Sequence, residues 1–204
     1  SGGRKASDQV MMTAQQLFER FSPERDSPAD FLQQLVFEAH TVIRLTAVSA
    51  EQEPHSTVAA FIVMPDASCH WVHAGDSRIY HFNQGRLLRR TLDHSYVQTL
   101  VDKGYLTPEQ ANSHPQSNVL VGCLGTEADP PATAALIPAL AAGDALVACS
   151  DGVWHYLTDD EMGHIVDQLP AKESCQTLIS IARERARGYG DNLSVLVVKF
   201  EIKS

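Results

Sequence analysis

The chain has 204 residues, of which 44% are apolar and 20% charged, and this suffices for one globular domain with a sizeable core. Its 16 Lys and Arg against 25 Asp and Glu give a formal net charge of −9. An acidic balance of this kind excludes nucleic acid and anionic membrane surfaces as expected partners, because both bind through many cationic contacts.

The chain begins with two helical patterns. Apolar residues recur at helical spacing over residues 6–21, which predicts an amphipathic helix. Ser27 can cap a second helix, with Pro28 in its first turn and Asp30 near the positive end of the helix dipole. The buried face predicted for this second helix consists of Phe31, Leu32, Leu35, Val36, Ala39, Val42 and Ile43.

Strand patterns follow the two helices. Four strands are expected, over residues 57–64, 69–74, 78–82 and 86–90. Turn residues separate the first two strands, and the short loop at 83–85 has the length and composition of a hairpin connection. Residues 57–91 are therefore predicted to form an antiparallel meander.

The second half of the chain alternates between the two patterns. Helical signals over residues 94–120 include a helix start at Thr107, and the high polarity around them predicts a surface excursion. A strand is expected at 145–150, and Thr158 with Glu161 forms a second capping box. Two helices and a closing strand over residues 193–200 complete the pattern. The apolar positions of the first helix are Met162, Ile165, Val166 and Leu169, and those of the second helix are Cys175, Leu178, Ile179, Ala182 and Ala186. One α+β domain is the simplest interpretation.

Cysteine usage and apolar segments indicate the compartment. The four cysteines, at positions 69, 123, 149 and 175, lie far apart and form no Cys-x-x-Cys pair, so we expect buried thiols in a reducing environment. The most apolar stretch, residues 132–150, is interrupted by Pro, Gly and Asp, and the N-terminus lacks an apolar segment of signal-peptide type. We expect a soluble cytoplasmic domain, or a domain cut from a larger protein, with no membrane insertion.

Three aspartates share a local context in which the carboxylate stands beside a glycine at a predicted strand end. They are Asp76 after Gly75, Asp151 before Gly152, and Asp191 after Gly190. If the strands are neighbours, three hard oxygen ligands converge at one edge, which suits Mg²⁺ or Mn²⁺. The alternative is ordinary turn chemistry, because Asp and Gly are common wherever strands end.

Longer motifs around these aspartates favour the metal interpretation. They read, in chain order, WVHAGDSRIY at 71–80, LVACSDGVW at 146–154 and GDNLSV at 190–195. These strings resemble three motifs of the metal-dependent protein phosphatases of type 2C, the PPM family. The pair Ser56-Thr57 resembles the family's paired hydroxyls, and residues 93–97 with 114–120 resemble the flap segment of its bacterial branch. Five ordered motifs spanning the whole chain are far more specific than a single pattern match.

The resemblance implies the fold. The family has a four-layer α/β/β/α sandwich of two antiparallel sheets flanked by helices, which is an α+β architecture. Residues 1–204 are then expected to be a single phosphatase-like domain that lacks its first strands, with residues 92–127 as a flap-like surface segment.

The resemblance also implies a reaction and a set of ligands. The activity is that of a Mg²⁺- or Mn²⁺-dependent protein serine/threonine phosphatase, which hydrolyses phosphoserine and phosphothreonine by in-line attack of a metal-bridging hydroxide. Asp151 and Asp191 would hold a two-metal centre, and Asp76 with Asp151 would hold a weaker third ion. Asn192 and Gly152 would support these ligands.

The implied partner is a phosphorylated protein substrate, with the enzyme opposing a serine/threonine kinase in bacterial signalling. His94 and Ser95, at the start of the flap, are candidates for substrate contact, and a capping or hydrogen-bonding role is the alternative for His94. Ser150 precedes Asp151 but lacks the Gly-x-Ser-x-Gly context of a serine hydrolase nucleophile. Trp154 is expected to brace the metal loop by packing, and Arg78 to order its own turn.

Two departures from the family pattern are visible. The family's catalytic histidine, its phosphate-binding arginine and its first metal-binding Asp-Gly motif are expected upstream of Ser1, so we expect very little activity from these 204 residues alone. Residues 120–125 read LVGCLG where the bacterial flap often reads LTRALG, which loses a hydroxyl and a cation. The main alternative function is a catalytically silent phosphatase-like domain that binds a phosphoprotein or a kinase, and a structural acidic domain with incidental cation sites is a third.

Overall fold

The computed structural model describes residues 2–47, 54–188 and 192–201. The chain divides into two compact units: unit 1 consists of Ser1–Asp76 and Asp93–Pro138, and unit 2 of Ser77–Leu92 and Ala139–Ser204. Each unit has its own antiparallel sheet and its own buried apolar cluster.

Unit 1 contains a three-stranded sheet in the order β1-β2-β5. Strand β1 (Val58–Val63) pairs with β2 (Cys69–Ala74), and β2 pairs on its other side with β5 (Thr133–Ile137). Asp66 closes the turn between β1 and β2, because its carboxylate accepts hydrogen bonds from the backbone N–H and the hydroxyl of Ser68 at 2.9 and 2.6 Å.

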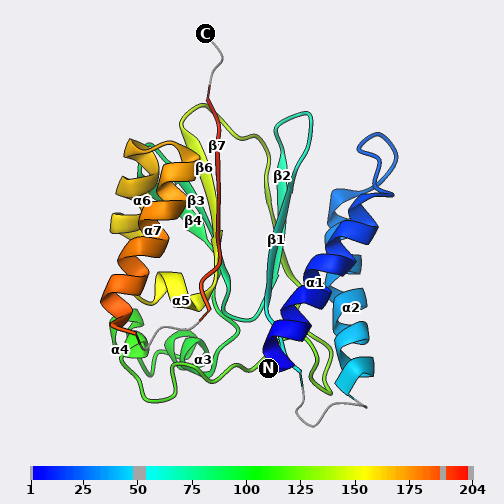
Figure 1. The fold of residues 1–204 in the computed structure, drawn as a ribbon, viewed down its shortest axis with the longest axis horizontal. Helices are drawn as coiled ribbons and strands as arrows, with labels where there is room; N and C mark the ends of the chain where they lie inside the picture. Colours follow the sequence, from blue (N-terminus) through cyan, green and yellow to red (C-terminus); the bar gives the residue numbers. More distant parts are fainter. Residues whose placement is uncertain (1, 48–53, 189–191, 202–204) are drawn as a thin grey trace. The chain divides into compact units, whose positions relative to one another are not determined.

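Two long helices pack on this sheet. They are α1 (Gly2–Phe18) and α2 (Pro28–Ala47), which lie side by side against β1 and β2 in Figure 1. As predicted, Ser27 caps α2 by accepting a hydrogen bond from the Asp30 N–H at 3.2 Å. The buried cluster between helices and sheet consists of Ala6, Val10, Leu32, Val36, Ala39, Ile43, Val58, Ile62, Val72, Ala74 and Leu124.

Unit 1 also carries the flap-like segment, which contains two short helices. Ser95 caps α3 (Tyr96–Asp102) by accepting from the Gln98 N–H at 3.2 Å. Thr107 starts α4 (Pro108–Asn112) with a complete capping box to Gln110, which confirms the helix start predicted there. An isolated bridge between Ser95 and Leu120 closes the segment on itself, and a second bridge between Ser56 and Leu124 fastens its end to the rest of unit 1.

Unit 2 contains a four-stranded sheet in the order β4-β3-β6-β7, with all neighbours antiparallel. Its strands are β3 (Arg78–Asn83), β4 (Arg86–Arg90), β6 (Asp144–Cys149) and β7 (Val195–Lys199). Strand β6 is central and buried along nearly its whole length, which explains its apolar composition.

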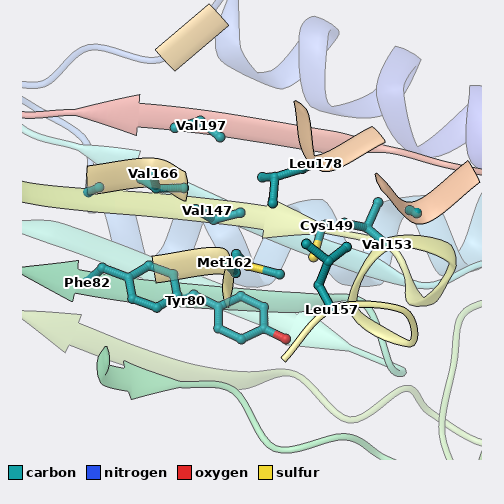
Figure 2. Close-up of a cluster of buried hydrophobic side chains, with 12 residues drawn as sticks. Tyr80, Phe82, Val147, Cys149, Val153, Leu157, Met162, Val166, Leu178 and Val197 are labelled. Atoms are coloured by element: carbon teal, nitrogen blue, oxygen red, sulfur yellow. The ribbon is translucent and has the colours of Figure 1, made fainter. Parts of the chain in front are cut away.

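The described residues of unit 2 also form α5 (Asp151–Trp154), α6 (Asp159–Gln168) and α7 (Ala171–Ala186). Helices α6 and α7 cover one face of the sheet in Figure 1. Figure 2 shows the core beneath them, where Tyr80, Phe82 and Val147 from the sheet meet Met162 and Leu178 from the helices. The capping box predicted at Thr158 is present at the start of α6.

The predicted meander over residues 57–91 is wrong. Strands β1 and β2 belong to the sheet of unit 1, and β3 and β4 to the sheet of unit 2. The chain changes sheets at residues 75–77. Strand β2 is paired on one side with β1 and on the other with β5, and β3 is paired with β4 and β6, so neither strand has a free edge with which to pair with the other. Strand β5 is one that the sequence pattern does not predict; it is short and mostly exposed at a sheet edge.

None of the helices within the described parts of the chain has the length and apolar content needed to cross a membrane.

Candidate functional site

The loop that carries Asp151 is joined to the start of β7. Strands β6 and β7 are neighbours with Cys149 opposite Val195, and the pairing continues with a hydrogen bond from the Ser150 N–H to the Ser194 carbonyl at 3.0 Å. The Ser150 hydroxyl donates to the Asn192 carbonyl at 3.2 Å and accepts from the Ser194 N–H at 3.1 Å. Ser150 therefore has a structural role, holding two of the predicted motifs together.

Gly152 permits the closest approach between these motifs. Asp151 begins α5, and its Oδ1 accepts a hydrogen bond from the Gly152 N–H at 2.8 Å. A Cβ on Gly152 would lie 2.6 Å from the backbone oxygen of Asn192, so a larger residue does not fit without movement of the backbone. The supporting positions predicted for Gly152 and Asn192 thus lie side by side next to Asp151.

A cation–aromatic contact braces the same loop. The guanidinium carbon of Arg78 lies 3.5 Å from the centroid of the Trp154 ring, and Nη1 of Arg78 donates to the Tyr80 hydroxyl at 3.4 Å. Arg78 is 8% exposed. The ring contact agrees with the expectation that Trp154 braces the Asp151 loop by packing, and the expectation that Arg78 orders its own turn stays a prediction.

In unit 1, Asp76 follows a backbone turn that only glycine accommodates. Gly75 has φ of +106°, and a Cβ at this position would overlap the side chain of Thr57. Thr57, the second of the two predicted hydroxyl residues, therefore lies next to the Asp76 turn.

His94 is hydrogen-bonded to the same turn. Its backbone N–H donates to the Gly75 carbonyl at 2.9 Å, and its Nδ1 accepts from the Gly75 N–H at 3.0 Å. Its Nε2 lies 2.8 Å from Oγ1 of Thr133, and its ring stacks on that of His73 with centroids 4.4 Å apart. Burial, with a smaller contribution from the neighbouring His73, lowers the pKa of His94 to about 4.

The departure at residues 120–125 leaves a tightly packed segment. A Cβ on Gly122 would lie 2.5 Å from the Pro131 ring, and Cys123 is buried. Burial and the negative charge of Asp76 both raise the pKa of the Cys123 thiol. Cys123 is therefore a protonated thiol in the position where the family pattern has alanine.

The three predicted metal ligands do not all lie within the described residues of one unit. Asp76 belongs to unit 1 and Asp151 to unit 2, and Asp191 lies outside the described residues. Within residues 2–47, 54–188 and 192–201, no group of three or more His, Cys, Asp or Glu side chains is arranged to hold a metal ion. The predicted assignment of Asp76, Asp151 and Asp191 to metals stays a prediction.

The contacts that the sequence does not reveal are those made across long stretches of chain. Thr133 comes from the unpredicted strand β5, and it meets a histidine 39 positions earlier. The hydrogen bonds of Ser150 depend on the register of β6 with β7, which has no local signal.

The chain is similar to bacterial serine/threonine phosphatases. It is 36% identical over 157 residues to the serine/threonine protein phosphatase PstP of Mycobacterium tuberculosis, a match that covers 74% of this chain and 29% of PstP. The chain thus spans less than a third of the length of this curated relative. No protein-family model matches it.

Solved structures give the same result over nearly the whole chain. The crystal structure of the M. tuberculosis phosphatase PstP/Ppp matches with a TM-score of 0.85 and 30% identity, covering 98% of this chain and 83% of that one. A structure of the PstP catalytic domain in complex with two manganese ions matches with a TM-score of 0.79 and 28% identity, over 95% of this chain and 80% of that one.

Together, the two helix-flanked antiparallel sheets and the motif-bearing loops define an α+β protein of the phosphatase 2C class, as predicted. The chain belongs to the PPM family of serine/threonine protein phosphatases.

Proposed function

We propose that this protein is a Mn²⁺- or Mg²⁺-dependent phosphatase that hydrolyses phosphoserine and phosphothreonine in proteins. The observation that carries the proposal is the loop pair of unit 2, in which Ser150 and Gly152 hold Asp151 against Asn192. A binding surface does not require this arrangement of a carboxylate at a strand end. Family membership adds the reaction class.

The donor chemistry fits the proposed metals. Carboxylate oxygens are the ligands that Mg²⁺ and Mn²⁺ prefer, whereas three of the four thiols of this chain are buried. Asp151 and Asp191 would hold two ions, as many as the PstP catalytic domain contains in its manganese complex, and Asp76 with Asp151 would hold a third. Bound ions would supply a water of lowered pKa as the nucleophile and offset charge on the phosphoryl oxygens.

The chain's own groups have defined tasks in this proposal. The hydrogen bond from the Gly152 N–H orients one oxygen of Asp151. Arg78 and Trp154 would stabilise the loop, and the flap would carry residues that meet the protein substrate. The proposed setting is a reducing cytoplasm, which suits four free cysteines, and the proposed counterpart is a serine/threonine kinase.

The test is hydrolysis of a phosphothreonine peptide by the protein expressed from its complete reading frame, with Mn²⁺ and with EDTA. We expect Mn²⁺-dependent release of phosphate and its loss in Asp151→Asn, which keeps the acceptor for the Gly152 N–H but removes the charge. Asp8→Asn, on the exposed face of α1, is the matched control and should be unaffected. Folded protein without hydrolysis would contradict the proposal and favour a silent phosphatase-like binding domain.

A further inference from the structure

His94 fixes both polar backbone groups of Gly75, the residue immediately before Asp76. The Gly75 carbonyl accepts from the His94 N–H at 2.9 Å, and the Gly75 N–H donates to His94 Nδ1 at 3.0 Å. The partner lies 19 positions further along the chain, so the contact joins the end of β2 to the start of the flap.

The hydrogen bonds define the tautomer of the ring. Nδ1 accepts from a backbone N–H, so it carries no proton, and in the neutral ring the proton must be on Nε2. Nε2–H then donates to Oγ1 of Thr133 at 2.8 Å. The parallel His73 ring, 4.4 Å away, holds the imidazole plane, and the low pKa of His94 keeps it neutral at pH 7.

The turn before Asp76 is consequently restrained on several sides. Strand β2 holds Ala74 in register with Val58, the Thr57 side chain occupies the space that a Gly75 side chain would need, and His94 binds the Gly75 backbone. We propose that His94 is a positioning residue that sets the Asp76 carboxylate for metal binding through Gly75, in place of a contact with substrate. This inference rests on the proposed function only in taking Asp76 as a metal ligand.

The same geometry gives the flap and the Asp76 turn a common anchor. Ser95, the next residue, caps α3, and the Val121 N–H donates to the His94 carbonyl at 2.9 Å. Residues that support a ligand from outside the metal shell commonly change metal affinity by roughly 10- to 100-fold when they are removed. Loss of the His94 ring should therefore weaken metal binding at Asp76 without removing any ligand.

Nuclear magnetic resonance of the protein from its complete reading frame tests each step. The imidazole nitrogen shifts of His94 should report the Nε2–H tautomer, and the Gly75 amide should exchange slowly. Mn²⁺ should broaden the amide signals of residues 75–77 in the wild type. In His94→Leu we expect faster Gly75 exchange and roughly tenfold weaker broadening per added Mn²⁺.

Matched variants separate positioning from general damage. His94→Asn places Oδ1 where it can accept from the Gly75 N–H, so it should recover most of the Mn²⁺ response. Thr133→Val removes the exposed hydroxyl that pairs with Nε2 of His94 and should partially weaken the Mn²⁺ response. Thr133→Ser keeps a hydroxyl there and should restore the response. His164→Leu, on the exposed side of α6, should leave the response unchanged.

The inference and the proposed function fail in different ways. An Nδ1–H tautomer overturns the inference, and so does a wild-type Mn²⁺ response in both His94→Leu and Thr133→Val. If His94→Leu does not fold, a wild-type Mn²⁺ response in Thr133→Val is by itself sufficient to overturn the inference. Wild-type protein that shows the broadening at residues 75–77 but no phosphatase activity contradicts the proposed function and supports the inference. Absence of broadening there in the wild type overturns the inference.

Discussion

Gly152 is the residue at which the Asp151 loop has least room. Its hypothetical Cβ would lie 2.6 Å from the Asn192 oxygen and 3.0 Å from Cδ2 of Leu193. The first of these atoms belongs to the backbone and cannot rotate away. A side chain at position 152 therefore requires a shift of the backbone that precedes β7.

Gly152→Ala should therefore lower the free energy of unfolding by about 1–3 kcal/mol, the usual cost of overpacking. Gly3→Ala is the control, because Gly3 lies in α1 with nothing within 4 Å of its Cβ position. That change should stabilise the protein by up to about 1 kcal/mol through helix propensity. Urea denaturation measures both, and equal stability of the two variants would contradict the close-approach argument.

Cys149, next to the Asp151 loop, should be chemically inert in the folded protein. It is 4% exposed, and burial raises the pKa of its thiol to about 12, so almost no thiolate exists at neutral pH. Mass spectrometry after brief iodoacetamide treatment should find Cys175, which is half-buried, modified well before Cys149. Modification of both at the same rate under native conditions would show that the core is open.

At the scale of elements, the start of α6 combines a capping box with an ion pair. Thr158 accepts from the Glu161 N–H at 3.2 Å, and the Glu161 carboxylate accepts from the Thr158 N–H at 2.9 Å. Arg185 of α7 binds both carboxylate oxygens of Glu161, at 2.7 and 2.9 Å, and also the Tyr156 carbonyl. The guanidinium of Arg185, followed by the Thr158 N–H, lowers the pKa of Glu161 to about 2.

The lowered pKa of Glu161 predicts a pH-dependent contribution to stability. The folded state binds the Glu161 proton less tightly than the unfolded chain, so the contribution is complete above the ordinary glutamate pKa of 4.5 and is lost as the pH falls toward 2. Because the pair is largely exposed, Glu161→Gln should cost only about 1 kcal/mol at pH 7 and a small part of that at pH 2, where the folded-state carboxylate is half-protonated. Thermal unfolding across this pH range checks it against Glu173→Gln, on the exposed first turn of α7. A cost of Glu161→Gln that is undiminished at pH 2 would contradict the linkage.

The helix starts were predictable from sequence because their signals are local. Ser27, Thr107 and Thr158 each act within three residues of themselves. The assignment of β2 and β3 to different sheets, by contrast, depends on β5 and β6, which come much later in the chain. The candidate site shows the same contrast between local and long-range features. Short motifs identify Asp76 and Asp151 as candidates, whereas no sequence pattern predicts the hydrogen bond between His94 and Thr133.

At the scale of the whole molecule, the net charge of −9 includes the carboxylates proposed to bind metal. Cations that bind only the folded state stabilise it, by about 2.7 kcal/mol at a concentration 100 times the dissociation constant of one site. Mn²⁺ should therefore raise the unfolding temperature of the wild type.

The shift should be smaller in Asp151→Asn and unchanged in Asp8→Asn, measured by calorimetry at constant ionic strength so that general screening is equal. An identical Mn²⁺ shift in Asp151→Asn would place the stabilising cations elsewhere.

The alternation of the two units along the chain has a consequence for synthesis. When Pro138 has left the ribosome, all three strands of the unit 1 sheet are available, since β5 ends at Ile137. The β3–β4 hairpin has by then emerged from the ribosome, but its central partner β6 has not. The nascent chain therefore passes through an interval in which Tyr80 and Phe82 lack the core that later buries them, and this hairpin is the segment most exposed to chaperones and to misassociation during translation.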